Sequence, residues 1–188
     1  MGRHAYLIIA HNKWNNLQTL VELLDDDRND IFIHIDKKGC FSNEQIITIQ
    51  ENARKSSIIF IDRISVSWGA YSLIDATLKL LEAATKRGNY LYYHLLSGSD
   101  LPIKHQDYIH DFFDENQGKE FIHIGDREWN LKTKDRAQYY WMFQEIAGNS
   151  RQCYCRILRA LVSVKSVPVC MPPEPRRSTA TVCQGILW

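Results

Sequence analysis

Short apolar runs alternate with segments of helical spacing along most of this chain, and this alternation limits the folds open to it. The runs are rich in β-branched and aromatic residues and are bounded by polar or turn residues, which predicts buried strands. They cover residues 5–10, 31–35, 58–61, 91–96 and 121–124. Between them, apolar side chains recur with helical spacing over residues 14–24, 73–84 and 106–113. Strand alternating with helix predicts an α/β fold with a mostly parallel sheet flanked by helices.

The length and charge of the chain narrow its class. Its 188 residues suit a single domain with a sizeable core. A formal net charge of +1 gives no sign of a nucleic-acid-binding surface. No apolar run approaches the roughly 20 residues of a membrane span, and the N-terminal residues predict a first strand rather than a signal peptide. We therefore expect a cytoplasmic protein, with peripheral association at the inner face of the membrane left open.

The cysteines and prolines gather near the C-terminus. The cysteines are Cys40, Cys153, Cys155, Cys170 and Cys183. No Cys-x-x-Cys pair or Cys/His zinc spacing occurs, so we expect free thiols and no metal site. Residues 167–175 hold four of the five prolines, which excludes a regular helix or central strand there. The chain is thus predicted to form a core over residues 1–148 and an irregular tail over residues 149–188.

Polar and small residues gather where the predicted strands end. In a parallel sheet the functional face lies at the carboxyl ends of the strands, so residues from different runs are expected to meet there. The candidates are Ala10, His11, Asp36, Trp68, Gly69, Ser99 and Asp100. The carboxylate of Asp36 can accept hydrogen bonds from a uracil N–H or a ribose hydroxyl. Trp68 offers an aromatic wall, and Gly69 allows close backbone approach.

Each candidate also has an ordinary structural interpretation. Asp36 stands before two lysines and could lie in a solvated turn. His11 could be a hydrogen-bonded residue at the rim, and Trp68 could belong to the core. Asp100 could serve only as the cap of a turn. The shared position of these residues at strand ends is what favours a binding site.

Several segments together resemble a known enzyme family. They cover residues 5–11, 33–38, 66–73, 93–104 and 118–122, and their order and spacing fit from residue 4 to about residue 148. As a set they resemble the core-2/I-branching β-1,6-N-acetylglucosaminyltransferase family, which also includes peptide O-xylosyltransferases. The lack of a membrane anchor in the sequence favours a bacterial-type member.

The resemblance implies a GT-A type nucleotide-sugar fold and an inverting glycosyltransferase. Such an enzyme moves a sugar of the N-acetylglucosamine or xylose type from a UDP-sugar donor to a hydroxyl of an acceptor glycan. On this resemblance Asp36 would bind the uridine, and Ala10 and His11 would line the nucleotide pocket. Trp68 and Gly69 would lie on the donor side.

The resemblance also implies that neither a metal nor another cofactor is used. Ser99 and Asp100 fall near the Asp-x-Asp metal motif of many other GT-A enzymes, but here the first acid is replaced by Gly98. Basic side chains would then neutralise the diphosphate. Ser65 stands where the family carries a tyrosine that helps to hold the nucleotide, so this chain departs from the family at that contact.

The resemblance places the catalytic base outside the chain. In the family the base is a glutamate in a Pro-Asp-Glu-like segment, and residues 184–188 resemble the segment that precedes it. We therefore expect a C-terminally truncated chain whose base lies beyond Trp188. The acceptor-binding candidates are Glu128, Lys134, Asp135 and Arg136, with a solvated charged segment as the alternative.

Three functional interpretations stay open from the sequence. The first is the donor-binding portion of a metal-independent glycosyltransferase that acts on bacterial surface or capsular polysaccharide. The second is a nucleotide-sugar-binding fragment without catalysis. The third is an unrelated α/β nucleotide-binding enzyme. Release of UDP in the presence of donor and acceptor separates the first from the second.

Overall fold

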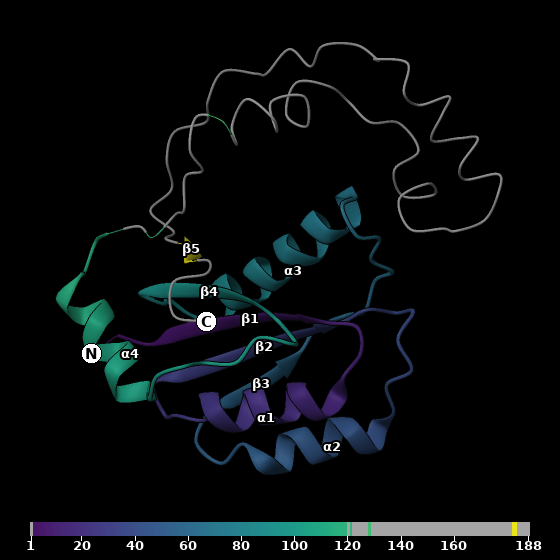
Figure 1. The fold of residues 1–188 in the computed structure, drawn as a ribbon, viewed down its shortest axis with the longest axis horizontal. Helices are drawn as coiled ribbons and strands as arrows, with labels where there is room; N and C mark the ends of the chain where they lie inside the picture. The colour runs from purple at the N-terminus through teal and green to yellow at the C-terminus, as the bar shows by residue number, and fades with distance from the viewer. Residues whose placement is uncertain (1, 120, 122–127, 129–181, 184–188) are drawn as a thin grey trace. The chain divides into compact units, whose positions relative to one another are not determined.

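The computed structural model describes residues 2–119, 121, 128 and 182–183 (Figure 1). The strands are β1 (His4–Ala10), β2 (Asn29–Ile35), β3 (Ser57–Phe60), β4 (Tyr92–Ser97) and β5 (Val182–Cys183). The helices are α1 (Trp14–Leu24), α2 (Asn43–Asn52), α3 (Tyr71–Arg87) and α4 (Gln106–Glu115). All neighbouring strands pair in parallel. The predicted α/β fold is therefore confirmed, and it is consistent with a GT-A-like domain.

The strand order of the sheet is β3-β2-β1-β4-β5. The chain runs outward from β1 through β2 to β3, and then returns to place β4 on the other side of β1. Such a reversal makes a topological switch point between β1 and β4. In open α/β sheets, ligands bind outside the carboxyl ends of the strands at this point. The order of strands therefore predicts that a ligand would bind near the residues that follow β1, β2 and β4.

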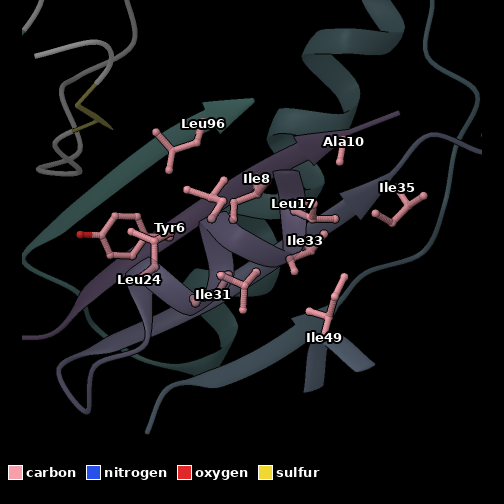
Figure 2. Packing of buried hydrophobic residues seen from close by; sticks show 12 residues of the cluster. Tyr6, Ile8, Ala10, Leu17, Leu24, Ile31, Ile33, Ile35, Ile49 and Leu96 are labelled. Atoms are coloured by element: carbon pink, nitrogen blue, oxygen red, sulfur yellow. The ribbon is translucent and has the colours of Figure 1, made fainter. Parts of the chain in front are cut away.

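Helices cover both faces of the sheet, and a cluster of buried apolar residues lies against each face, with a third cluster of Tyr92, Ile109 and Phe113 beside α4. Figure 1 shows α1 and α2 together on one face and α3 on the other. The cluster on the α1 and α2 face (Figure 2) consists of Tyr6, Ile8, Ala10, Leu17, Leu20, Val21, Leu24, Ile31, Ile33, Ile35, Ile49 and Leu96. The cluster on the α3 face consists of Ala5, Leu7, Phe32, Leu80, Ala84 and Tyr93. Successive residues of β1 alternate between the clusters because side chains of a strand point to opposite faces. Burial of each large apolar side chain contributes about 2 kcal/mol.

Helix α2 lies outside the predicted helices because its apolar pattern is weak, with Ile49 as its one buried residue. Its start is fixed instead by a capping box. The Ser42 hydroxyl accepts from Gln45 N at 3.3 Å, and the Gln45 side chain accepts from Ser42 N at 2.9 Å. These two bonds satisfy backbone donors that the first turn of a helix leaves without partners.

Two other predicted segments fall largely outside the described residues. Of the predicted strand over residues 121–124, only Phe121 is described, and it is in no strand. Of the predicted irregular tail, only the two residues of β5 are described, and they pair with β4.

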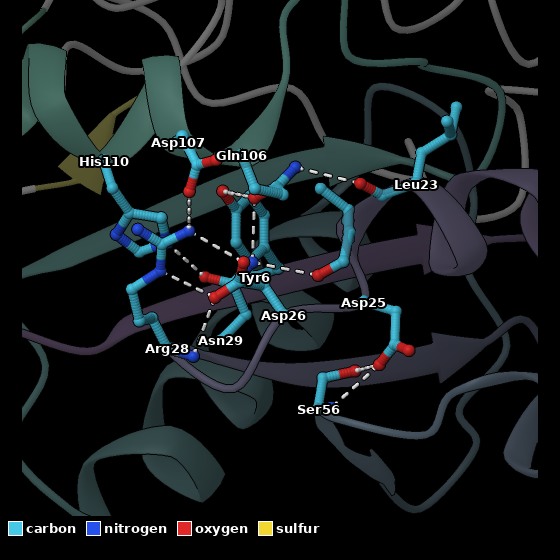
Figure 3. Close-up of polar contacts among 11 residues, drawn as sticks. Tyr6, Leu23, Asp25, Asp26, Arg28, Asn29, Ser56, Gln106, Asp107 and His110 are labelled. Atoms are coloured by element: carbon cyan, nitrogen blue, oxygen red, sulfur yellow. Dashed lines mark hydrogen bonds and ion pairs between the residues drawn. The ribbon is translucent and has the colours of Figure 1, made fainter.

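Side-chain bonds connect α4 to the turn between α1 and β2 and to the first residue of β2 (Figure 3). The Gln106 Oε1 atom accepts from Asn29 Nδ2 at 2.8 Å. Arg28 pairs with Asp26 and with Asp107, each at 2.7 Å. Rings of α4 also contact the first residues of β1 and β4. Helix α4 therefore packs at the amino ends of these strands and leaves their carboxyl ends uncovered by this helix.

The chain divides into two compact units. The first comprises residues 1–66, 75–122 and 180–188, and the second comprises residues 67–74 and 123–179. The sheet, α1, α2 and α4 belong to the first unit. The predicted boundary between residues 148 and 149 lies outside the described residues and stays a prediction.

Candidate functional site

The carboxyl edge of the sheet brings together three of the predicted strand ends. Ala10 ends β1, Asp36 directly follows β2, and Ser97 ends β4. Because β1 lies between β2 and β4, the segments that follow these strands are neighbours at the switch point. The structure thus unites these segments within the first unit, and their role in binding stays a prediction.

Glycines on both sides let the neighbouring loops close onto the end of β1. Gly98 N donates to Ile9 O at 2.9 Å, and a Cβ at residue 98 would lie only 2.6 Å from the Cβ of Ala10. On the other side, a Cβ at Gly39 would lie 2.8 Å from the carbonyl oxygen of His11. Only glycine fits such close approaches without a shift of the neighbouring strand.

Asp36 is the buried carboxylate of this edge, with 7% of its surface exposed. Its Oδ1 atom accepts from Lys38 N at 2.9 Å and from Val66 N at 3.2 Å. Its own N–H donates to Ala10 O at 2.8 Å. The interpretation of Asp36 as part of a solvated turn is therefore wrong, because the side chain links the loop after β2 to the segment after β3.

The segment after β3 leaves the sheet before β2 ends. The β2–β3 ladder ends at the pair Ile33 and Phe60. Beyond it, the buried His34 accepts from Ile64 N at 3.1 Å through Nε2, and Lys37 N donates to Ile64 O at 3.0 Å. Burial lowers the pKa of His34, which keeps the ring neutral and able to accept. Beyond the end of the ladder, one side-chain and one backbone hydrogen bond thus join these two segments.

Residues 97–100 form a closed turn after β4. Asp100 N donates to Ser97 O at 3.0 Å, and Ser97 N donates to Asp100 Oδ2 at 2.7 Å. Ser99 N lies 3.3 Å from the Ser97 hydroxyl. These bonds are those of a turn capped by an aspartate, the structural interpretation given above. A donor-binding role for Ser99 and Asp100 stays a prediction.

Trp68 and Gly69 lie in the second unit, in a turn before α3. Ala70 N donates to Ser67 O at 3.1 Å, and Ser67 N donates to the Ser72 hydroxyl at 2.8 Å. Gly69 has a φ of 74°, in the left-handed region that favours glycine. The surface of Trp68 is 76% exposed, so its interpretation as a core residue is wrong.

The other predicted residues are placed as follows. His11 and Glu128 are exposed, and Lys134, Asp135 and Arg136 lie outside the described residues. Within the described ranges, no three His, Cys, Asp or Glu side chains are grouped in a way that could hold a metal ion. None of the helices described here is both long enough and apolar enough to cross a membrane.

Three residues that organise this edge were missed by the sequence analysis: His34, Gly39 and Arg63. Gly39 carried a local signal, because a glycine shortly after a strand often marks a tight turn. Arg63 carried none, since the carbonyl groups that it contacts on Asp36 and Gly39 lie 27 and 24 residues earlier in the chain.

Comparison with known proteins decides the family. The family model of the Core-2/I-Branching enzyme matches residues 4–154. The chain belongs to the Core-2/I-branching enzyme family. The expected family is therefore confirmed, and the carboxyl edge from Ala10 to Asp100 lies wholly within the matched part of this Core-2/I-branching chain.

The Core-2/I-branching chain is similar to a small part of a longer curated relative. Xylosyltransferase oxt of Drosophila pseudoobscura pseudoobscura is 25% identical to it over 134 residues. The aligned part covers 67% of this chain and 14% of that protein.

Proposed function

We propose that this chain binds the uridine of a UDP-sugar at the carboxyl edge of its sheet and is the donor-binding part of an inverting, metal-independent glycosyltransferase. Membership of the Core-2/I-branching family and similarity to a xylosyltransferase support transfer of a sugar. The position of the site rests on one observation, the buried carboxylate of Asp36 at a strand end beside the switch point.

The hydrogen bonds of Asp36 suit a fixed acceptor. The Oδ1 atom accepts both backbone hydrogen bonds, from Lys38 N and from Val66 N. No hydrogen bond to Oδ2 is found among the described residues, so this arrangement holds the carboxylate in one orientation and offers Oδ2 to a ligand. A uracil N–H or a ribose hydroxyl supplies the required donor, and a hydrogen bond to a charged acceptor contributes about 2 kcal/mol.

The reaction proposed is direct displacement at the anomeric carbon. The oxygen of an acceptor hydroxyl forms a bond to that carbon while the bond to the diphosphate oxygen breaks, and UDP leaves with the electron pair. The hydroxyl proton passes to a general base, a role that we give to none of the described residues. Asp36 and Asp100 accept backbone hydrogen bonds, which suits them to hold loops and ligands.

Asp36→Asn tests the donor site with little change of shape. Asparagine keeps a carbonyl oxygen for the N–H groups of Lys38 and Val66, but it places an NH₂ donor where Oδ2 would accept from uracil. We expect calorimetry in the presence of EDTA to show UDP binding to the unaltered chain and binding weakened by about 30-fold in Asp36→Asn. Asp62→Asn is the matched control, because this exposed aspartate follows β3 outside the proposed contact.

Two outcomes would contradict the proposal: no UDP binding by the unaltered chain, or equal binding by Asp36→Asn. Equal affinity for ADP and UDP would overturn the assignment of uracil. Loss of binding in EDTA that is restored by a divalent cation would overturn metal independence.

The second candidate is a nucleotide-sugar-binding fragment without turnover, favoured because none of the described residues is assigned as the general base. UDP-N-acetylglucosamine and UDP-xylose incubated with an oligosaccharide acceptor separate the two functions. Release of UDP supports the enzyme, and binding without release supports the fragment. The acceptor, the polysaccharide pathway and peripheral membrane association stay predictions.

A further inference from the structure

Arg63 ties together the two segments that meet at Asp36. Its Nη2 atom donates to the carbonyl oxygens of Asp36 at 2.9 Å and Gly39 at 2.6 Å, with that of Lys37 farther away at 3.4 Å. All three carbonyls belong to the loop after β2, whereas Arg63 belongs to the segment after β3. The guanidinium therefore joins the two segments beyond the end of the β2–β3 ladder.

Arg63 shares the support of this loop with other hydrogen bonds, among them Lys37 N to Ile64 O at 3.0 Å and Lys38 Nζ to Val66 O at 2.8 Å. Gly39 N donates to Asp36 O at 2.9 Å, which closes a tight turn over residues 36–39. In that turn several carbonyl oxygens point toward one side, and a cation there offsets their partial negative charges. Removal of the guanidinium would take one hydrogen-bond partner from each of these carbonyls and loosen the turn.

The position of the turn decides the position of the Asp36 carboxylate. One link of the carboxylate runs to Lys38 N in the same turn, and the other runs to Val66 N in the segment of Arg63. Arg63 thus connects the turn that contains Lys38 N with the segment that contains Val66 N, the two donors that orient the carboxylate. A ligand group held in one orientation loses less conformational freedom on binding, so affinity depends on such support.

We propose that Arg63 is a positioning residue of the donor site, which acts on the nucleoside through the orientation of Asp36. This inference rests on the proposed function, and it adds the residue that prepares the site for uridine. The rival role for an exposed guanidinium at this edge is a direct contact with the diphosphate, and the two roles differ in which part of the ligand they affect.

Calorimetry with uridine and with UDP on the Arg63→Met chain separates these roles. A positioning role weakens uridine and UDP alike, by about tenfold each. A direct contact with phosphate weakens UDP and leaves uridine unchanged. Arg54→Met is the matched control, since it removes one exposed guanidinium away from the site, and it should alter neither affinity.

Two further variants make the test sharper. In an Asp36→Asn background, Arg63→Met should cause no further loss of uridine affinity, because the residue acts through a carboxylate that is already changed. Arg63→Lys should restore part of the affinity, because Nη2 alone makes the contacts and one ammonium nitrogen can replace it. Hydrogen exchange should quicken at the amides of residues 38 and 39 in Arg63→Met and stay unchanged in β1.

The outcomes distinguish the inference from the proposed function. Absence of uridine and UDP binding to the unaltered chain overturns the donor site itself, and the role of Arg63 with it. Normal UDP binding by the unaltered chain and by Arg63→Met overturns only the role of Arg63. A loss confined to UDP, or a full additional loss in the Asp36→Asn background, also refutes positioning through Asp36.

Discussion

Three buried histidines at the amino ends of β1 and β4 should make the fold sensitive to mild acid. His4 Nδ1 and His94 Nε2 lie 3.1 Å apart, and His110 Nε2 contacts Asn29 Oδ1 at 2.9 Å. Each of the three residues is at most 1% exposed. The rings of His4 and His110 also lie close, with centroids 4.1 Å apart. A proton added to any of these rings has no contact with water to stabilise it.

Burial is the main reason that these rings stay neutral in the folded chain. It lowers the pKa of His4 to about 2 and that of His94 to about 3, from an ordinary value of 6.5. Burial also lowers the pKa of His110. Neighbouring histidines add to the effect at His4 and His94.

The sign of the pH effect follows from these lowered values. Below its ordinary pKa each histidine takes up a proton in the unfolded chain but not in the folded one, so the free energy of unfolding falls as the pH falls. Between about pH 7.5 and about pH 5.5 the loss is about 1.4 kcal/mol each for His4 and His94, or about 3 kcal/mol together, and His110 adds to it in the same direction. Total stabilities of domains are about 5 to 15 kcal/mol, so this loss is large.

Urea unfolding followed by circular dichroism over this pH range measures the effect. His110→Phe should reduce the proton uptake on unfolding and therefore lower the slope of the free energy of unfolding against pH near the acid end. The unaltered chain, measured in the same buffers, is the control. His34, also buried with a lowered pKa, contributes equally to both chains.

A constant free energy of unfolding between these pH values would refute the reasoning. So would equal slopes for His110→Phe and the unaltered chain. Asp25 and Asp26 do not confuse the result, because their pKa values lie below the ordinary 3.8 and their protonation belongs to more acidic solutions.

Two further substitutions test the packing and the polar links. Gly98→Ala should lower the stability by about 2 kcal/mol, because the new Cβ meets Ala10. Gly88→Ala is the control and should not lower it, because no atom lies within 4 Å of the new Cβ. Thermal unfolding compares the two variants. Asp25→Ala should cost about 2 kcal/mol, because Asp25 accepts the N–H groups of residues 54–56. Burial raises the pKa of Asp25, but these hydrogen bonds outweigh it and lower the pKa, so its stabilisation should disappear as the pH falls below about 4. An unchanged urea midpoint in Asp25→Ala at neutral pH would contradict this account.

Strands and helices with a strong apolar pattern were predictable from the sequence. The spacing over residues 14–24 matches the bounds of α1, and β1, β2 and β4 each lie within a few residues of their predicted runs. These elements have buried faces, so their sequences must follow the period of a strand or a helix. Helix α2 buries little and begins at Ser42 through a capping box, a different signal that the apolar pattern does not contain.

The candidate site was predictable in part. The strand ends that carry Ala10, Asp36 and Ser97 could be placed at one edge, because the carboxyl ends of parallel strands meet there. The partners of these residues could not be foreseen. Val66 N reaches Asp36 across 30 residues of chain, and Arg63 finds its carbonyls only because the segment after β3 leaves the sheet early.

The sequence alone determined which segments form strands and helices, the resemblance to a family, and the residue types at the strand ends. The tertiary structure decided which of them touch: Gly98 against Ala10, Arg63 against the turn after β2, and three histidines at one end of the sheet. The physical reason is range. Periodicity and capping act over a few residues, whereas these contacts join positions far apart in the chain, and only the packed sheet brings them within the few ångströms over which hydrogen bonds and close packing act.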